Sequence, residues 1–537
     1  MTQIQRSAHV DTFTRDSLPP RATWPEFLFT LPELQYPAAL NCAAALLDRH
    51  VLEGAGATRC LVTDTETWTY ADLLKRSNQV ARVLVDEADM VPGNRVLLRG
   101  PNNPWLVATW FGVLKAGGVA VTTMPLLRSG ELRTMAEIAD VKLSVCDHRF
   151  IQDLGAAGIP GLTSLVYGGA AQDDLTMLAG HQPEEFENVA TAADDVCILA
   201  FTSGTTGKPK ATMHFHRDIL AIAETFSRHI LRPNPSDLFA ASPPLAFTFG
   251  LGQSVVFPLH AGAATYLMEQ PSPPRLLEAV ERHSITVLAT APTAYRAMLP
   301  NLGEARIGSL RACVSAGETL PKATWDAVHD ACGIRIIDGI GSTEMLHIFI
   351  SAAGADIRPG STGRAVPGYV AEVQDPDGRP APDGELGRLA VKGPTGCRYL
   401  RGDRQTTYVR DGWNVTGDVY ERDGDGYFHF QARADDMIIS AGYNIAGPEV
   451  EEALLRHPAV AEVAVIGAPD AERGMIVKAV VVLQPGAALG PEPARTLQDF
   501  VKSQIAPYKY PRAIEFAETL PRTATGKLQR FRLREEA

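Results

Sequence analysis

Residues 201–210 read FTSGTTGKPK, a run of Ser, Thr and Gly that ends in two lysines on either side of Pro209. Small residues allow a loop to bend closely around phosphate oxygens, which backbone N–H groups and lysine charges can bind. The spacing differs from that of the Walker loop, because Gly204 and Gly207 lie too close together and Lys208 precedes Pro209 instead of Ser or Thr. We therefore predict a loop that binds the phosphates of a nucleoside triphosphate.

Short apolar runs flank this loop on both sides. Residues 196–201 (VCILAF) and 211–215 (ATMHF) have the composition of short strands. The loop is therefore expected to join two strands rather than to open a helix. A polar hairpin turn without a ligand is the common alternative for such clusters. An inert turn, however, needs neither so many small and polar residues nor two lysines.

The overall composition favours small-molecule chemistry. The chain has 537 residues and a net charge of −12, with its basic residues scattered. A chain of this length is expected to form more than one hydrophobic core. The scattered charges form no basic patch that could bind nucleic acid or anionic lipid. The N-terminus does not resemble a signal peptide, and Lys115, Gly117 and Gly118 divide the apolar stretch 105–127 into pieces too short to cross a bilayer. We expect a cytoplasmic protein without a membrane span or a nucleic-acid partner.

The cysteines are dispersed, odd in number and free of any Cys-x-x-Cys pair. This usage is typical of a reducing compartment and argues against structural zinc. The seven cysteines are Cys42, Cys60, Cys146, Cys197, Cys313, Cys332 and Cys397.

Changes in composition and hydrophobic pattern divide the chain into predicted domains. Residues 1–41 are Pro-rich with aromatic anchors, which predicts an arm packed on the main body. From there helical patterns alternate with short Val/Ile/Leu runs, as in parallel sheets covered by helices. Gly, Pro and Asp turns predict a β-rich module over about 362–433, and a further change predicts a boundary between domains 1–433 and 434–537. The predicted fold is α/β: a large N-terminal domain of two helix-covered sheets with a small β-barrel-like module, then a small α+β domain.

Two further motifs follow predicted strands. Residues 315–318 (SAGE) follow the strand 311–314, where small residues would let a flat base lie against the backbone. Residues 338–344 (DGIGSTE) follow the strand 334–337, and their Thr hydroxyl could bond an α-phosphate while the terminal Glu holds Mg²⁺. The alternatives are a plain turn for the first motif and a capped helix start for 342–344.

Three later stretches carry weaker signals. Residues 413–418 (WNVTGD) would place Asp418 after a tight turn, where it could accept both ribose hydroxyls, although a solvated turn aspartate is commoner. Residues 433–435 (RAD) lie at the proposed domain boundary, close to Gly442, and could be an exposed linker. Lys527 lies in a short predicted loop near the C-terminus. A surface lysine is usually inert, so a functional role for Lys527 is indicated only by the motifs that precede it.

Together these motifs resemble, in type and order, the adenylate-forming superfamily of acyl- and aryl-CoA synthetases, firefly luciferases and nonribosomal adenylation domains. The resemblance implies the use of ATP, CoA and Mg²⁺, and a mobile C-terminal domain that swings about Asp435 to exchange Lys527 for the Gly442 loop of a pantetheine tunnel. Ile340 departs from the aromatic residue that many members place against adenine. The implied catalytic residues are Lys527, Thr343, Glu344 and Asp435, with Glu344 as the metal ligand. The implied ATP- and AMP-binding residues are Thr202, Ser203, Gly204, Thr205, Thr206, Gly207, Lys208, Ser315, Ala316, Gly317, Glu318, Asp338, Gly339, Ile340, Gly341, Ser342, Thr343, Asp418 and Arg433.

The chemistry of adenylation explains these residue types. A carboxylate must attack an α-phosphate that is itself negative, so a metal ion and a lysine have to neutralise charge as pyrophosphate leaves. A thiol then attacks the acyl-adenylate and needs little activation, because a few per cent of it is thiolate near neutral pH.

The acid that is activated is expected to be aromatic. Phe247 and Phe249, with glycines nearby, suggest a flat apolar slot, although both could be core residues. Their combination with His347 resembles the benzoate–CoA ligase branch, and the run 24–43 resembles 2-aminobenzoate–CoA ligases. Thr248 could accept a hydrogen bond from an ortho-amino group. The implied aryl-binding residues are Phe247, Thr248, Phe249, Gly341, His347 and Ile348.

The resemblance thus implies an aryl–CoA ligase that forms aryl-CoA, AMP and pyrophosphate through an aryl-adenylate. Its favoured acid is 2-aminobenzoate, followed by benzoate or a substituted benzoate. The alternatives are an aryl-AMP ligase that loads a carrier protein, and a nucleotide-binding protein that has lost the reaction. A downstream acyl-transfer or carrier protein is a possible partner, and the chain is expected to be a monomer or a homodimer.

Overall fold

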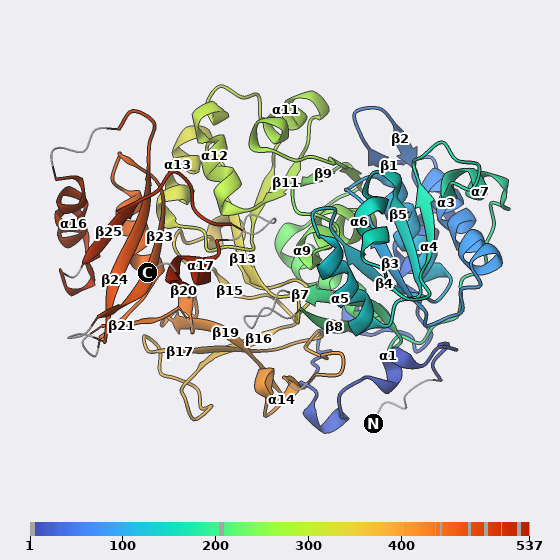
Figure 1. The fold of residues 1–537 in the computed structure, drawn as a ribbon, viewed down its shortest axis with the longest axis horizontal. Helices are drawn as coiled ribbons and strands as arrows, with labels where there is room; N and C mark the ends of the chain where they lie inside the picture. Colours follow the sequence, from blue (N-terminus) through green and yellow to red (C-terminus); the bar gives the residue numbers. More distant parts are fainter. Residues whose placement is uncertain are drawn as a thin grey trace.

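The computed structural model describes residues 6–202, 209–402, 404–434, 436–440, 443–470, 474–487, 492–505, 507–522 and 528–535. Their strands form four sheets. Figure 1 shows the sheet that contains β23 and β24 at one end of the molecule and the sheet that contains β3 and β4 towards the other.

The largest sheet has nine strands, and the six at its centre run parallel. Antiparallel strands close both of its edges. This arrangement confirms the prediction of a parallel sheet from alternating helices and strands. In spatial order the strands are β15 (Arg364–Ala365), β14 (Ile348–Ser351), β13 (Ile337–Gly341), β12 (Ala312–Ser315), β11 (Val287–Thr290), β9 (Leu238–Ala241), β10 (Ala264–Tyr266), β1 (Arg59–Val62) and β2 (Thr67–Thr69).

The second sheet has six strands and ends in the hairpin that holds the Gly-rich loop. Strands β7 (Val196–Thr202) and β8 (Lys210–Phe215) pair antiparallel, with Thr202 opposite Lys210. The prediction that the loop joins two strands is therefore confirmed. The other strands, in spatial order, are β6 (Thr163–Tyr167), β5 (Leu143–Asp147), β3 (Arg95–Arg99) and β4 (Val119–Thr123).

The first two long helices show how the local sequence determines where a helix begins and which of its faces are buried. Helix α3 (Tyr70–Arg82) begins with a capping box, in which Thr69 and Asp72 bond each other's backbone N–H groups at 2.9 and 3.1 Å. Helix α4 (Pro104–Lys115) is buried on nearly every side, which explains its continuous apolar sequence. Burial lowers the pKa of Lys115, and its pairing with Asp48 at 2.6 Å opposes this shift. In the part of the chain that the structure describes, no helix is long and apolar enough to span a bilayer.

Other helices follow the strands in sequence and cover both sheets (Figure 1). Several of them end or continue in wider π-helical turns, as over Ala223–Leu231 and Gly252–Val256. The α-helices of this part are α1 (Phe13–Asp16), α2 (Arg49–Leu52), α5 (Ser129–Ala139), α6 (Ile151–Ala156), α7 (Leu175–His181), α8 (His216–Ile222), α9 (Thr248–Leu251), α10 (Phe257–His260), α11 (Pro273–His283), α12 (Pro292–Leu302) and α13 (Lys322–Cys332).

Residues of the predicted N-terminal arm contact the main body. Trp24 lies 5.9 Å from the ring of Phe215, and the backbone N–H of Leu28 donates to the carbonyl of Gly393. The buried Arg398 guanidinium lies 3.9 Å from the centre of the Phe215 ring and pairs with Asp218. Arm and body thus share one cation–aromatic cluster.

Two smaller sheets complete the fold. The β-rich module is a five-stranded sheet of β16 (Val370–Gln374), β17 (Leu386–Lys392), β18 (Val409–Arg410), β19 (Trp413–Arg422) and β20 (Phe428–Arg433), with α14 (Gln405–Tyr408) beside it. The last part has the sheet β21 (Ile438–Ser440), β22 (Tyr443–Ile445), β23 (Val460–Asp470), β24 (Gly474–Leu483) and β25 (Ala513–Phe516), with helices α15 (Gly447–Leu455), α16 (Pro493–Gln504) and α17 (Arg530–Glu535). This is the small α+β domain that was expected, and its exact boundary near residue 434 stays a prediction.

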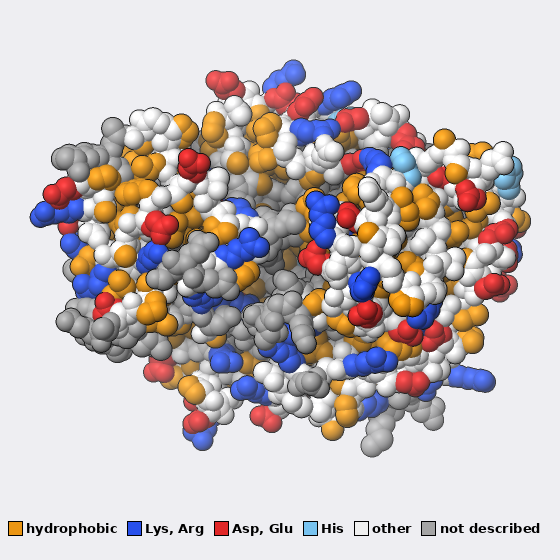
Figure 2. Space-filling view, in the orientation of Figure 1, with side chains coloured by type: hydrophobic (Ala, Val, Ile, Leu, Met, Phe, Trp, Pro, Cys, Tyr) orange, Lys and Arg blue, Asp and Glu red, His pale blue; other side chains and the backbone are white. Residues whose placement is uncertain are grey.

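The visible surface mixes both signs of charge. Figure 2 shows Lys and Arg side chains interspersed with Asp and Glu over this face. The pattern matches the scattered charges of the sequence and presents no single-sign stripe on this side.

Candidate active site

The phosphate-binding hairpin is described at its base only. Thr202 ends β7 and Lys210 begins β8, with the Lys210 ammonium 6.0 Å from the ring centre of Tyr399. Burial, followed by the nearby Arg404, lowers the pKa of Lys210. The predicted site residues that lie outside the described residues are Ser203, Gly204, Thr205, Thr206, Gly207, Lys208, Asp435, Gly442 and Lys527.

Strand β8 holds the Thr343–Glu344 motif in place. The Thr343 carbonyl is 2.9 Å from Nε2 of His214 and accepts from the Thr212 hydroxyl at 3.4 Å. Residues 342–344 form a turn between β13 and β14, so the alternative of a helix start is wrong. The sequence separates these two motifs widely, and the structure brings them into contact.

Tyr399 orients the predicted metal ligand. Its hydroxyl donates to Oε1 of Glu344 at 2.6 Å, and its backbone forms an isolated bridge with Thr212. Burial, and then the Glu344 charge, raise the pKa of Tyr399, which keeps it a donor. A half-buried carboxylate held at one oxygen is the hard oxygen ligand that Mg²⁺ prefers. Glu344 therefore fits the role of a metal ligand, which stays a prediction.

The two motifs predicted to border adenine lie on neighbouring strands. Ser315, at the end of β12, is paired in register with Asp338 of β13. Gly317 has a φ of +90°, a left-handed conformation that a side chain would strain. Strand β13 extends through Gly341, so the expectation that 338–344 follows the strand is corrected: its first four residues belong to the strand. Strands that end beside one another form the crevice in which α/β sheets bind ligands.

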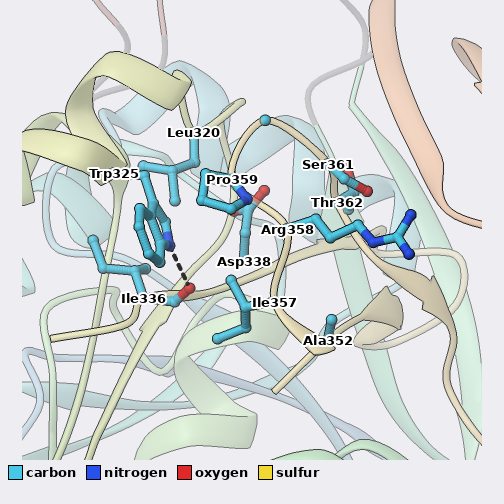
Figure 3. A pocket seen from close by; sticks show the side chains of 11 residues that line it. Leu320, Trp325, Ile336, Asp338, Ala352, Ile357, Arg358, Pro359, Ser361 and Thr362 are labelled. Carbon is cyan, nitrogen blue, oxygen red and sulfur yellow. Dashed lines mark hydrogen bonds between the residues drawn. The ribbon is translucent and has the colours of Figure 1, made fainter. Parts of the chain in front are cut away.

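Asp338 lines a small cavity under the loop 357–362, which Figure 3 shows from close by. The indole of Trp325 forms one wall and donates to the Ile336 carbonyl at 3.0 Å. Oδ1 of Asp338 is buried and has no hydrogen-bond partner among the described residues. Burial raises the pKa of Asp338 to about 7. An acceptor in this state gains from any donor, such as an exocyclic amine, that a ligand brings.

The predicted ribose site is an ion pair between adjacent strands. Arg433 of β20 donates to Oδ1 of Asp418 at 3.1 Å, and the two residues face each other in the ladder. Asp418 lies within β19 rather than after a tight turn, which corrects that expectation. Burial raises the pKa of Asp418, and Arg433 opposes the rise.

The predicted aryl-binding residues meet around helix α9. Phe247, Thr248 and Phe249 are half-buried at its start, and Phe249 also packs against the buried core. Their neighbour His347 is buried, and its ring centre lies 5.7 Å from that of Phe249 and 4.6 Å from that of Phe257. Ile348 is buried and Gly341 is exposed, and a Cβ on Gly341 would lie 2.7 Å from the His347 carbonyl oxygen.

The His347 imidazole is neutral and unsatisfied. Neither ring nitrogen has a hydrogen-bond partner within the described parts of the chain. Burial lowers the pKa of His347 to about 3, against a smaller opposing effect of the Phe249 backbone. A Cβ on Gly252 would lie only 2.4 Å from the His347 ring, so this glycine is needed for the packing. A buried neutral imidazole can offer one donor and one acceptor to a ligand.

The C-terminal domain contacts the motif that is predicted to border adenine. Arg522, which directly precedes the undescribed residues 523–527, pairs with Glu318 at 3.4 Å and with Glu462 at 2.6 Å. The Arg296 side chain donates to the Val460 carbonyl at 3.2 Å. The domain therefore contacts the nucleotide motif through the segment that leads into the loop of Lys527.

Sequence reasoning missed the supporting residues. Neither Tyr399 nor His214 belongs to a motif whose spacing suggests chemistry, and each acts through a residue far away in the chain. The signal that could have marked His214 is its place beside the Gly-rich loop in a strand that had to be buried. Tyr399 has no local signal.

Comparisons with known proteins agree with this geometry. The AMP-binding enzyme family matches residues 47–399, and the C-terminal domain of AMP-binding enzymes matches residues 449–527. The benzoate–CoA ligase of Thauera aromatica is 37% identical over 519 residues, which cover 94% of this chain and 98% of that protein.

Two solved structures are similar over nearly the whole chain. The anthranilate CoA ligase AuaEII in complex with anthranoyl-AMP matches with a TM-score of 0.90 and 34% identity, covering 94% of this chain and 99% of that one. A benzoate CoA ligase from Burkholderia xenovorans LB400 matches with a TM-score of 0.85 and 33% identity, covering 92% and 100%. The chain therefore belongs to the AMP-binding enzyme family and is an AMP-forming acid–thiol ligase of the benzoate–CoA ligase type.

Proposed function

We propose that this ligase activates 2-aminobenzoate with ATP and transfers it to CoA, releasing AMP and pyrophosphate. The observation that carries the proposal is the aromatic enclosure of His347, whose neutral ring has no hydrogen-bond partner among the described residues. A flat ring with a neutral amino group can pack against the aromatic side chains and bond the imidazole, whereas a long aliphatic chain has no polar group to bond it. The similarity to the anthranilate CoA ligase AuaEII supports the same acid.

Within this proposal each described motif has a task. The crevice beside Ser315 and Asp338 binds adenine, and Asp418 with Arg433 binds the ribose. Glu344, oriented by Tyr399, would hold Mg²⁺, which would neutralise charge on the phosphates. The Thr343 hydroxyl would bond the α-phosphate that the carboxylate attacks.

Thr248 is the proposed contact of the ortho-amino group, because it is half-buried between Phe247 and Phe249 at the start of α9. Its hydroxyl can accept the amine hydrogen bond, while valine has the same shape without the oxygen. We expect Thr248→Val to lower the preference for 2-aminobenzoate over benzoate, measured as a ratio of kcat/KM values, by about tenfold, the value of one hydrogen bond of roughly 1.4 kcal/mol. An unchanged ratio would show that this role is wrong.

The overall reaction is tested by ATP-dependent AMP release over a panel of aryl acids, with and without CoA. The proposal predicts the highest kcat/KM with 2-aminobenzoate, and AMP release that depends on CoA beyond the first turnover. Turnover with benzoate alone would move the assignment to benzoate. AMP formation that is independent of CoA would favour an enzyme that loads a carrier protein.

The proposed role of Lys527 is tested by measuring adenylation and thioester formation separately. Lys527→Ala should slow formation of the aryl-adenylate by at least about a hundredfold, since removing one charged group that stabilises a transition state costs about 2.7 kcal/mol or more. The same variant should still convert supplied aryl-adenylate into thioester. Equal losses in both half-reactions would contradict the exchange of Lys527 for the Gly442 loop by domain movement.

A further inference from the structure

Two buried cysteines and a histidine, which are far apart in the sequence, meet at the end of the β7–β8 hairpin that lies away from the Gly-rich loop. Cys42 lies just after the N-terminal arm, Cys197 is the second residue of β7, and His216 directly follows β8. All three are fully buried. One ligand atom from each lies within 4.8 Å of the other two.

We propose that Cys42, Cys197 and His216 bind a thiophilic d¹⁰ metal ion, with Zn²⁺ as the physiological candidate. Two sulfurs and one imidazole nitrogen are the donors that such ions prefer. A tetrahedral zinc ion with Zn–S near 2.3 Å and Zn–N near 2.0 Å holds its donors roughly 3.5 to 3.8 Å apart, so the cluster needs movements of about 1 Å. The odd, dispersed cysteines had argued against zinc, because spacing along the chain does not reveal this meeting in space.

The local backbone directs these side chains inward. The pairing of β7 and β8 is irregular between Val196 and Ile198, which places Cys197 at a bulge. Bulges turn one side chain away from the regular alternation of the strand. Nδ1 of His216 lies 3.1 Å from Sγ of Cys42 and 3.2 Å from its backbone nitrogen, a contact that the ion would replace.

A metal ion binds cysteine as the thiolate rather than as the thiol. Binding of a divalent ion would displace the thiol protons of Cys42 and Cys197 to solvent, leaving two thiolates and a neutral imidazole on the ion.

His9 of the N-terminal arm lies near this cluster, but it is not among the described side chains whose ligand atoms lie within 4.8 Å of one another. It is only 8% exposed, and its Nε2 has no hydrogen-bond partner in the described parts of the chain. It interacts electrostatically with His216 and with Asp195. The Nε2 of His216 is also buried without a partner among the described residues, whereas its Nδ1 contacts the backbone nitrogen and Sγ of Cys42.

The test uses the full-length protein, reduced and freed of metal with a chelator. Zn²⁺ is titrated in competition with a chromophoric chelator, and Cd²⁺ is used to follow the thiolate-to-metal absorption band. One equivalent should bind, and Cys42→Ala and Cys197→Ala should each weaken binding by at least about a hundredfold. Cys332→Ala is the matched control, because Cys332 is the partly exposed cysteine and the obvious site of adventitious binding.

Failure to retain one equivalent, equal binding by wild type and the Cys42→Ala and Cys197→Ala variants, or loss of binding in Cys332→Ala would each overturn the proposal. Because a core substitution could disturb folding, the wild-type protein is also loaded with Zn²⁺ and its X-ray absorption spectrum recorded. Two sulfur scatterers with nitrogen support the site, whereas nitrogen and oxygen alone contradict it. The measurement does not depend on ligase activity, so it stands apart from the proposed substrate.

Discussion

Removing a single hydroxyl, in the substitution Tyr399→Phe, tests whether Glu344 depends on its neighbour. The Tyr399 hydroxyl donates to Oε1 of Glu344 at 2.6 Å in a partly buried setting. A hydrogen bond to a charged group contributes about 1.5 to 3 kcal/mol. If Glu344 acts only when held in this orientation, the rate of adenylation should fall by about 10- to 150-fold.

The assay separates adenylation from thioester formation. Adenylation is followed by exchange of labelled pyrophosphate into ATP, and thioester formation by the reaction of supplied aryl-adenylate with CoA. Tyr399→Phe should slow the first and leave the second within about twofold, and the Mg²⁺ concentration for half-maximal exchange should rise. Tyr420→Phe is a matched control, because the Tyr420 hydroxyl lies 3.3 Å from that of Thr362 rather than against Glu344.

Exchange within about twofold of wild type in Tyr399→Phe would refute the reasoning, since the hydrogen bond would then not matter for the reaction. Equal slowing of both half-reactions would refute it as well, because it would indicate general damage to the site. A thermal melt of each variant distinguishes that damage from loss of the fold.

Three further outcomes follow from the geometry. Gly252→Ala puts a Cβ 2.4 Å from the His347 ring, so it should raise the KM for the aryl acid by about 5- to 150-fold, from an overpacking cost of about 1 to 3 kcal/mol, without changing the KM for ATP. Arg522→Ala breaks the pair with Glu318 and should slow adenylation about threefold to tenfold while sparing thioester formation; a larger effect on the thioester step would contradict the contact's role. Asp338→Asn tests a pH effect: the folded pKa of about 7 lies above the unfolded value, so the stability that the protonated carboxyl contributes is lost as pH rises through 7. The melting temperature of Asp338→Asn minus that of wild type should therefore increase between pH 5 and 8. A difference that stays constant over this range would exclude titration of Asp338.

The sequence predicted those parts of the molecule that local patterns encode. The short apolar runs on either side of the Gly-rich loop became β7 and β8, because their side chains are buried in a sheet. The apolar stretch from residue 105 became a buried helix and a strand, as Lys115 and its neighbouring glycines indicated.

What the sequence could not show were contacts that depend on how the sheets assemble. Tyr399 reaches Glu344 only because its backbone lies beside Thr212 of β8. Asp418 was expected after a turn, but the strand continues through it, since its ladder partner Arg433 extends the pairing. Cys42 and Cys197 lie far apart in sequence and were treated as separate, whereas tertiary packing makes them neighbours.

The N-terminal arm limits how freely this enzyme can be re-engineered. Trp24 and Phe27 cover the Arg398 guanidinium, which lies next to Tyr399 in the chain and therefore one residue from the group that orients Glu344. A shortened version that begins after the arm would expose a buried cation, and a chimera that takes its arm from a relative would need matching rings. Trp24 and Phe27 of the arm thus help to fix the segment that holds Tyr399, and a design that removes residues 6–41 should lose activity along with stability.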